Sequence, residues 1–496
     1  MYGILTPFLL DGNNISISHT QMKHYHHWLR IILLLPGLLL TACAMGPDYL
    51  RPQVDTAEKF RMSQIEGKSI ANLPWWELLQ DETLQQLIHQ ALQENKDLKQ
   101  AVASVEEFEA RLGASRMDFL PNLGFDANAP AFGRMGGFRF PGFPTPFNYY
   151  GQATLNWELD IWGKIRRANE AARADLLERE ENRHAVILIL VSAVAQAYFD
   201  LLQLDRQYEI AQQTLASWQE SLGLSQAQLD AGIISRIEFD QINAARANAV
   251  QQVAGLERQL RQKENELSVL LGSNPAPVAR GHSLAEQQMP LEVPAGLPSE
   301  LLQRRPDILR SEQALVAATA RIGVAKAARF PRLSITGFLG VASPALSNLL
   351  LSNSQFGASG LGLAGPLLNA QSLGFEQRAA EAQARQALAQ YEQTILVAFK
   401  EVEDALTAVH TANAQRKAQQ EQVEALRSAL QLANLRFQSG ITSHVDVLLV
   451  KRTLFEAESA LMATHRLHLV SIVQLYKALG GGWVLNAAPA QKGISG

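Results

Sequence analysis

Two long stretches of the chain carry apolar residues at alternating spacings of three and four, the pattern of helices packed along their length. The first stretch lies in residues 163–231, which contain no proline. Its seam positions are Ile187, Val191, Val194, Tyr198, Leu201, Tyr208 and Leu215. The seam positions of the second are Val423, Leu426, Leu430, Ala433 and Phe437. At about 1.5 Å per residue the first helix would be about 100 Å long, so the pattern predicts long coiled coils.

Each long helix is expected to end at a glycine, Gly232 or Gly440. A second helix then returns toward Gly272 or Gly480. Glycine is the preferred residue just beyond a helix C-terminus, because it adopts the left-handed conformation without strain. Each half of the chain is therefore expected to form a long helical hairpin with a glycine at its tip.

Four shorter segments instead alternate apolar and polar residues with a period of two, which is typical of strands. These segments are Asn122–Ala127, Tyr149–Leu159, Pro331–Val341 and Phe356–Leu363. A helix over Asp81–Asp118 is expected before the first of them, where Pro121 ends it. The sequence thus predicts two β-hairpins embedded in a mainly α-helical chain.

The two hairpin systems belong to an internal duplication. Residues 97–125 align without a gap on residues 307–335, pairing Gly113 with Gly323 and Pro121 with Pro331. A repeat of about 210 residues makes each half one structural unit. The predicted organisation is a first repeat at 81–272, a proline-rich linker at 273–306, a second repeat at 307–480 and a C-terminal tail at 481–496.

Composition excludes some classes of protein and leaves others open. The chain has 496 residues, 47% of them hydrophobic and 19% charged, with a net charge of −4. These values fit neither a disordered chain nor a polybasic nucleic-acid binder. Its longest apolar stretch, Ile31–Leu40, is half of the ~20 residues that a membrane-spanning helix needs. With basic residues before it and small residues after it, this stretch predicts a signal peptide over residues 1–42. Translation is expected to start at Met22 within this segment.

Cys43 is the only cysteine of the chain, so it cannot form an internal disulfide. Leu40-Thr41-Ala42-Cys43 resembles the bacterial lipobox, in which the cysteine becomes the diacylated first residue of the mature protein. The alternative is a cysteine that lies near a signal peptide by chance. Because Ala44 and not aspartate follows, the anchor is expected in the outer membrane. Residues 43–80 would then be an extended, lipidated leader.

Four strands cannot close into a membrane barrel by themselves, because known outer-membrane barrels begin at about eight strands and lipid tolerates no open sheet edge. Several chains must pool their strands. The helical hairpins, each with only a thin apolar seam, must likewise pack around a common axis. The sequence therefore predicts an oligomeric tube, in which a shared transmembrane β-barrel continues into a coiled-coil helical barrel across the periplasm.

Several local motifs carry a family resemblance. They are Gly46-Pro47-Asp48-Tyr49, the segment from Trp157 to Gly163 (WELDIWG), Arg304-Arg305-Pro306-Asp307-Ile308, the segment from Ile322 to Ala327 (IGVAKA), and Phe330-Pro331. As a set they resemble the NodT-type lipoprotein branch of the TolC-like outer membrane efflux family. The resemblance covers almost all of the mature chain.

The resemblance implies a homotrimer with a twelve-stranded barrel and a twelve-helix periplasmic tunnel, anchored to outer membrane lipid. It also implies a periplasmic adaptor protein that couples the tunnel to an inner-membrane pump, most often of the resistance-nodulation-division type. The function expected from it is passive conduction of small molecules, such as drugs, toxic compounds or metal ions, out of the cell. No nucleic-acid partner and no cofactor are implied.

Catalytic readings of the sequence are weak. The Gly360–Gly365 segment matches GxGxxG, but it falls inside a predicted strand and lacks the helix of a dinucleotide site. The acids Glu401, Glu403 and Asp404 are more simply a solvated helix face. No nucleophile and base pair and no zinc-ligand spacing stands out, so neither a catalytic site nor a metal site is predicted.

The candidate contact sites are the two hairpin tips. The glycines there are fully explained by the turns, so the flanking residues carry the functional interpretation as contacts to an adaptor. The tip residues are Gly232, Ile233 and Ser235 in the first half and Gly440, Ile441 and Ser443 in the second.

A candidate pore gate lies next to each tip, where an acid follows the glycine by six positions: Glu238 in the first half and Asp446 in the second. In the resembled family an aspartate at the Asp446 position faces the closed periplasmic end of the pore and helps to select cations. Leu449 replaces a second acid and Thr442 replaces an arginine of that family. The constriction is therefore expected to be more apolar here.

Two other classes of function stay open at the level of sequence. A structural lipoprotein that spans the periplasm would explain the helices and Cys43 but not the two alternating hairpins. The outer membrane duct of a polypeptide (type I) secretion system would share the architecture and differ only in its pump.

Overall fold

The computed structural model describes residues 44–55, 57, 59–61, 81–128, 149–287, 298–343, 346–366 and 370–481. The expected signal peptide (1–42), Met22 and Cys43 lie outside the described residues. The chain divides into two compact units. The sheet unit contains Met1–Asp48, Ser115–Asn169 and Ala320–Ala380, and the helical unit contains Tyr49–Ala114, Glu170–Thr319 and Glu381–Gly496.

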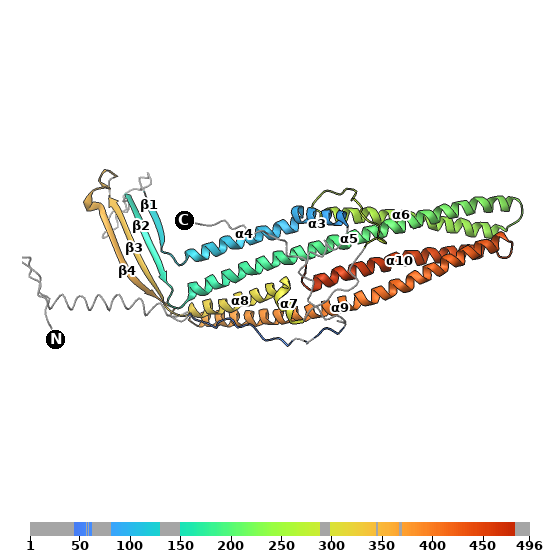
Figure 1. Ribbon diagram of the computed structural model, residues 1–496. Coiled ribbons are helices and arrows are strands. Elements are labelled where there is room, and N and C mark those ends of the chain that lie inside the picture. Colours follow the sequence, from blue (N-terminus) through green and yellow to red (C-terminus); the bar gives the residue numbers. More distant parts are fainter. Residues whose placement is uncertain are drawn as a thin grey trace, which may run out of the picture. The chain divides into compact units, whose positions relative to one another are not determined.

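Both halves of the chain have the same order of elements (Figure 1). The first half consists of α3 (Glu82–Glu94), α4 (Lys96–Met117), β1 (Asn122–Asn128), β2 (Tyr149–Leu159), α5 (Lys164–Asp230) and α6 (Arg236–Leu270). The second consists of α7 (Pro298–Arg304), α8 (Pro306–Ala327), β3 (Arg332–Ser343), β4 (Gln355–Ala364), α9 (Ala370–Gln438) and α10 (His444–Ala478). Two single turns, η1 (Leu346–Asn348) and η2 (Ser352–Ser354), lie between β3 and β4.

The four strands form one antiparallel sheet in the order β1-β2-β3-β4 (Figure 1). The central pair joins the two halves of the chain: β2 and β3 pair over their whole length, with Trp157 opposite Ile335. All four predicted strands are confirmed, and their bounds differ from the predicted ones by at most two residues. β1 and β4 are the edges of this sheet, each with a single neighbour among the described strands.

The helical unit contains two main apolar clusters. One joins α3, α5, α6 and α10 and is centred on fully buried side chains such as Tyr198, Leu201 and Leu267. The other joins α7, α8 and α9 to the end of α10, around Tyr391 and Ile395. The predicted seam of α5 lies in the first cluster from Ile187 to Leu201. In each half a short helix pair thus covers one end of a long hairpin.

α5 also contains an apolar window long enough to cross a membrane, by length and composition alone. Two thirds of that window, 67%, is buried inside the fold. This burial identifies the window as the core-facing part of a long helix, because a membrane-spanning helix would present its apolar side chains to lipid.

The prediction of one continuous helix over Asp81–Asp118 is wrong, because the chain breaks at Asn95. Asn95 is extended (ψ 134°) and its side-chain oxygen accepts a hydrogen bond from the Leu98 N–H at 3.0 Å. Its side-chain amide donates to the carbonyl of Leu270 at 2.9 Å. Asparagine competes well for such caps, so it ends α3 and starts α4. The predicted linker, in turn, contains the short helix α7.

Candidate functional site

The sheet has one apolar face and one polar face, as its pairing register requires. Residues on the apolar face are paired across the strands: Leu123 with Leu155, Ile335 with Leu361, and Leu333 with Leu363. Several of these side chains are widely exposed, with 76% of Leu123 and 73% of Leu361 accessible. Asp126, Gln152, Thr154, Asn156 and Ser334 lie on the opposite face. A sheet that is apolar on one face and polar on the other is typical of a barrel wall between lipid and water.

The leader docks at the turn between β2 and α5. The Met45 N–H donates to the carbonyl of Trp162 at 3.0 Å. Arg167 of α5 is buried and donates to the carbonyl of Met45 at 3.2 Å and to the Asp48 carboxylate at 2.5 Å. These contacts join residues more than 100 positions apart, which the sequence patterns alone could not pair.

Three glycines allow the leader to approach this closely. Gly46 has a φ of +96°, and a Cβ there would lie 2.5 Å from the Cα of Gly323 in α8. A Cβ on Gly323 would lie 2.5 Å from the Met45 carbonyl oxygen and 2.7 Å from the Cγ of Arg167. A Cβ on Gly163 would similarly lie 2.7 Å from Ala44. Three motifs of the sequence, GPDY, WELDIWG and IGVAKA, thus meet at one docking site.

The turn after β2 is itself well ordered by hydrogen bonds. Asp160 accepts from the N–H groups of Ile165 and Arg166, both at 2.9 Å, and so caps the start of α5. The Trp162 ring stacks on Phe330 with 4.8 Å between ring centroids and donates to the Pro331 carbonyl at 2.7 Å. The leader therefore binds to a hydrogen-bonded turn, and Ala44 lies against Gly163 just after the end of β2.

Further along, the leader binds the helical unit through Glu312 of α8. Tyr49 donates to one carboxylate oxygen of Glu312 at 3.0 Å, and Arg51 donates to the other at 2.7 Å. Burial, with the Glu312 charge adding to it, raises the pKa of Tyr49, so the phenol stays protonated and acts as a donor. Beyond this contact, the backbone N–H of Arg61 donates to Glu403 of α9 at 2.9 Å.

The Arg305-Pro306-Asp307 motif fixes the C-terminus of α10. Arg305 is almost fully buried and pairs with Asp307 at 2.7 Å and with Glu401 at 2.6 Å. It also donates to the carbonyl of Ala478, in the last turn of α10, at 2.8 Å. A cation at this position complements the partial negative charge of a helix C-terminus. Glu401 is therefore the exposed half of an ion pair whose cation, Arg305, is buried.

The two hairpin tips have the same backbone geometry. Gly232 and Gly440 have φ values of +75° and +70°. The following isoleucines close the turn: the Ile233 N–H donates to Gln228 at 2.8 Å and the Ile441 N–H donates to Arg436 at 2.9 Å. The isoleucine side chains stay 70% and 66% exposed. Each tip therefore presents one apolar side chain to its surroundings.

The two candidate gate acids cap the returning helices. The Ser235 N–H donates to Glu238 at 2.8 Å, and the Glu238 N–H donates back to the Ser235 hydroxyl at 3.3 Å. In the second half the Ser443 N–H donates to Asp446 at 3.2 Å. A serine followed three residues later by an acid is a capping signature, and it was visible in the sequence. The constant spacing from glycine to acid therefore has a local structural cause.

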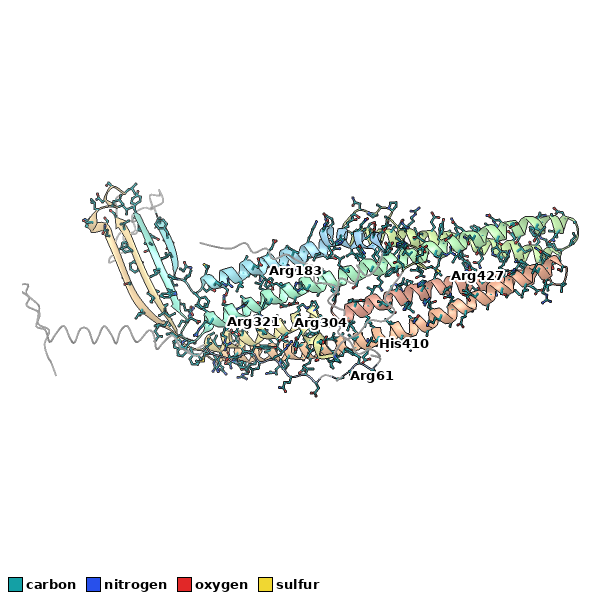
Figure 2. The ribbon with its side chains drawn as sticks, in the orientation of Figure 1. Arg61, Arg183, Arg304, Arg321, His410 and Arg427 are labelled. Atoms are coloured by element: carbon teal, nitrogen blue, oxygen red, sulfur yellow. The ribbon has the colours of Figure 1, made fainter. Side chains whose placement is uncertain are left out.

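The sequence did not predict the polar contacts between the two long hairpins. Lys451 of α10 donates to the Ser217 hydroxyl of α5 at 2.7 Å, and Arg466 pairs with Asp200 at 2.5 Å. Burial lowers the pKa of Lys451. Within the second hairpin, Arg427 of α9, which Figure 2 labels, pairs with Glu458 of α10 at 2.7 Å. Polar contacts therefore join α10 to both α5 and α9, in addition to the apolar packing.

The weak catalytic candidates have no supporting geometry. Gly360 and Gly362 lie within β4, and no helix starts at Gly365. Asp404 pairs with Lys400 one helical turn away. In the described part of the chain, no group of three or more His, Cys, Asp or Glu side chains could hold a metal ion.

Comparison with known proteins gives consistent matches over both halves. The sequence matches the outer membrane efflux protein family over residues 87–273 and 297–481. It is 33% identical to the cation efflux system protein CusC of Escherichia coli O6:H1 over 90% of this chain and 97% of CusC. It is also 33% identical to the toluene efflux pump outer membrane protein TtgC of Pseudomonas putida, over 93% of this chain and 97% of TtgC.

A solved structure has the same fold. The open-state crystal structure of the MtrE outer membrane channel of Neisseria gonorrhoeae superposes with a TM-score of 0.78 at 29% identity, covering 89% of this chain and 99% of MtrE. The match extends over both the sheet unit and the helical unit, since it covers nearly the whole described chain.

Proposed function

Because the chain belongs to the outer membrane efflux protein family, we propose that it is the outer membrane channel of a tripartite efflux pump. It conducts small molecules passively from the periplasm to the exterior and catalyses no reaction. The observation that carries this proposal is the four-stranded sheet with one exposed apolar face, one polar face and two free edges.

The channel is a homotrimer. Four strands leave the edges of β1 and β4 unpaired, and an unpaired backbone edge is not tolerated in lipid. Three copies joined edge to edge give a closed barrel of twelve strands, within the range of outer-membrane barrels. The apolar face then lies toward lipid and the polar face toward the lumen.

The helical hairpins continue the conduit below the membrane. The part of α5 in the helical unit, residues 170–230, is about 90 Å long at ~1.5 Å per residue. Three copies of the two hairpins pack around one axis as a twelve-helix tunnel. The repeats at 81–272 and 307–480 each supply one hairpin to it.

The leader attaches the channel to the outer membrane from the periplasmic side. Cys43 is the lipid attachment site, and residues 43–80 form the lipidated leader. Support comes from Ala44, which lies against Gly163 at the base of the sheet. A lipidated residue immediately before it would sit close to the membrane surface that the barrel crosses. Several acyl chains together give stable anchoring, where a single chain does not.

The partners are a periplasmic adaptor and an inner-membrane pump of the resistance-nodulation-division type. The adaptor contacts the hairpin tips, at Gly232, Ile233 and Ser235 and at Gly440, Ile441 and Ser443. Their identical geometry and exposed isoleucines support this assignment, because two equivalent tips per chain present six similar docking points in a trimer. The relatives CusC and TtgC are named for cation and toluene efflux, two chemically different substrates. Since this chain is equally similar to both, we infer that the pump and not the channel selects the exported molecule.

Asp446 lines the periplasmic constriction of the pore. Three carboxylates in one ring attract cations and repel anions. The capping hydrogen bond is accepted by the Oδ2 atom of Asp446. A carboxylate that accepts this bond keeps its negative charge, so Asp446 can cap α10 and attract cations at the same time. Glu238 has the same capping role in the first half, and it is the alternative gate acid.

The equal capping roles make Glu238 a matched control for Asp446. The purified trimer is reconstituted in planar bilayers, and the ratio of cation to anion permeability is measured for Asp446→Asn and Glu238→Gln. Both changes keep a side-chain oxygen that can accept the capping bond, so thermal stability should change little and to a similar extent. Only Asp446→Asn should reduce cation selectivity.

Two outcomes contradict the assignment in different ways. If Glu238→Gln alone changes selectivity, the wrong half has been assigned to the pore. If neither does, both acids are only caps. A wild-type protein that inserts into bilayers without conducting ions would contradict the channel function itself.

A further inference from the structure

A pair of phenylalanines lies on the polar face of the sheet. Phe338 of β3 is opposite Thr154 on one side and Ala358 on the other. Phe356 of β4 is opposite Gly340. The pairing register therefore puts both rings on the face that carries Gln152 and Thr154. The two ring centroids are 5.7 Å apart with an angle of 49° between the ring planes, so they form one aromatic surface.

The pair rests on a floor of small residues. A Cβ on Gly340 would lie 2.9 Å from the Cζ atom of Phe356, so only glycine leaves room for this ring. Ala358 and Gly360 flank Phe338 in the next strand. Phe338 remains 42% exposed within the chain. The two rings thus project above the small residues around them on this face of the sheet.

Packing in the membrane does not explain this placement. Phenylalanines that only stabilise the barrel would be expected on the lipid face, where Phe125 lies, because apolar side chains there avoid water. On the polar face their surface stays in contact with water. An acid shares this face: Asp126 lies in the same cross-strand row as Gln152, Gly340 and Phe356.

We propose that Phe338 and Phe356 form a binding site for aromatic organic cations on the wall of the lumen. The proposal rests on the channel function, which makes the polar face the lumen wall. A ring of the solute stacks on the exposed phenyl surface, and its positive charge is attracted by the ring faces. A trimer carries three such sites at one level of the barrel.

Single-channel recording with two matched cations tests the site. Benzyltrimethylammonium and tetramethylammonium carry the same charged group, and only the first has an aromatic ring. In the wild-type channel, benzyltrimethylammonium should block the current at a concentration at least threefold lower than tetramethylammonium. In the double variant Phe338→Ala/Phe356→Ala this preference should disappear.

Two further variants control for folding and for general loss of apolar surface. Phe125→Ala removes a ring from the opposite face of the same sheet, and it should keep the preference for the aromatic cation. Phe338→Leu keeps an apolar side chain without an aromatic face, and it should weaken the preference even if the double variant does not assemble.

Equal block by the two cations in the wild type would overturn the proposal. Retention of the aromatic preference in Phe338→Leu, or its loss in Phe125→Ala, would also overturn it. Each of these results leaves a conducting channel and so differs from failure of the proposed function, in which the wild-type protein carries no current.

Discussion

Replacing Gly323 by alanine should release the leader from its docking site. In a free helix this change would be favourable, because alanine is preferred over glycine by about 1 kcal/mol in a helix interior. In this fold the added Cβ would lie 2.5 Å from the Met45 carbonyl oxygen and 2.7 Å from the Cγ of Arg167. A backbone oxygen cannot turn aside as a flexible side chain can, so the leader must move.

The cost follows from the contacts that depend on the docked leader. Two hydrogen bonds involve Met45, one to Trp162 and one from Arg167, and each contributes about 0.5–1.5 kcal/mol. The ion pair of Arg167 with Asp48 adds little, about 0–1 kcal/mol, since the Asp48 side chain is 86% exposed. These contributions add up to about 1–4 kcal/mol. Because α8 is helical with the leader docked or released, the helix gain cancels, and docking should weaken by this amount.

The internal duplication supplies the control. Gly113 is the counterpart of Gly323 in α4, and among the described residues a Cβ there would meet nothing within 4 Å beyond the nearby backbone of its own helix. Gly113→Ala should therefore stabilise the protein slightly through helix propensity alone. Opposite effects of the same substitution at equivalent positions would isolate the contribution of the leader.

Hydrogen exchange read by mass spectrometry measures docking directly. For Gly323→Ala, exchange in residues 44–51 should accelerate at the Met45 amide, which donates to Trp162, by at least about fivefold, since ~1.4 kcal/mol corresponds to a factor of ten in population. Gly113→Ala should leave exchange of this segment unchanged. If Gly323→Ala leaves leader exchange unchanged and raises thermal stability as Gly113→Ala does, the leader is not held by this contact.

Two other substitutions test the interior of the helical unit. Arg305→Ala should lower stability by about 1.5–3 kcal/mol, because it removes a buried charged donor from the Ala478 carbonyl, whereas Arg304→Ala should cost little; thermal unfolding measures both. Burial lowers the pKa of His465 to about 4. The unfolded chain then binds more protons, so stability should fall as the pH drops from about 6.5 to 4, and less so in His465→Gln. Identical pH profiles for the variant and the wild type would refute this assignment.

The sequence predicted the elements of this fold well, because their periodicities have few alternative explanations. Alternation over ten residues permits only a strand, and a proline-free seam of spacing three and four permits only a long helix. The break at Asn95 was missed, since a single asparagine in a helical pattern is unremarkable until its cap to Leu98 is known.

The partners within the candidate site could not be predicted in the same way. The motif residues Asp48, Trp162 and Gly323 stand out in the sequence, but nothing in their spacing says that they meet. The Ser235-to-Glu238 spacing shows the capping role of Glu238 in the sequence, and its role as a gate stays a prediction. A local physical cause of that kind has to be weighed before a functional one.

The central claim is that three chains complete one channel, and native mass spectrometry of the purified protein in detergent tests it most directly. The expected result is a complex of three chains, each of which begins at a lipidated Cys43. A protein that conducts ions as a monomer would contradict the account, because four strands with two free edges could not then be the wall of the pore.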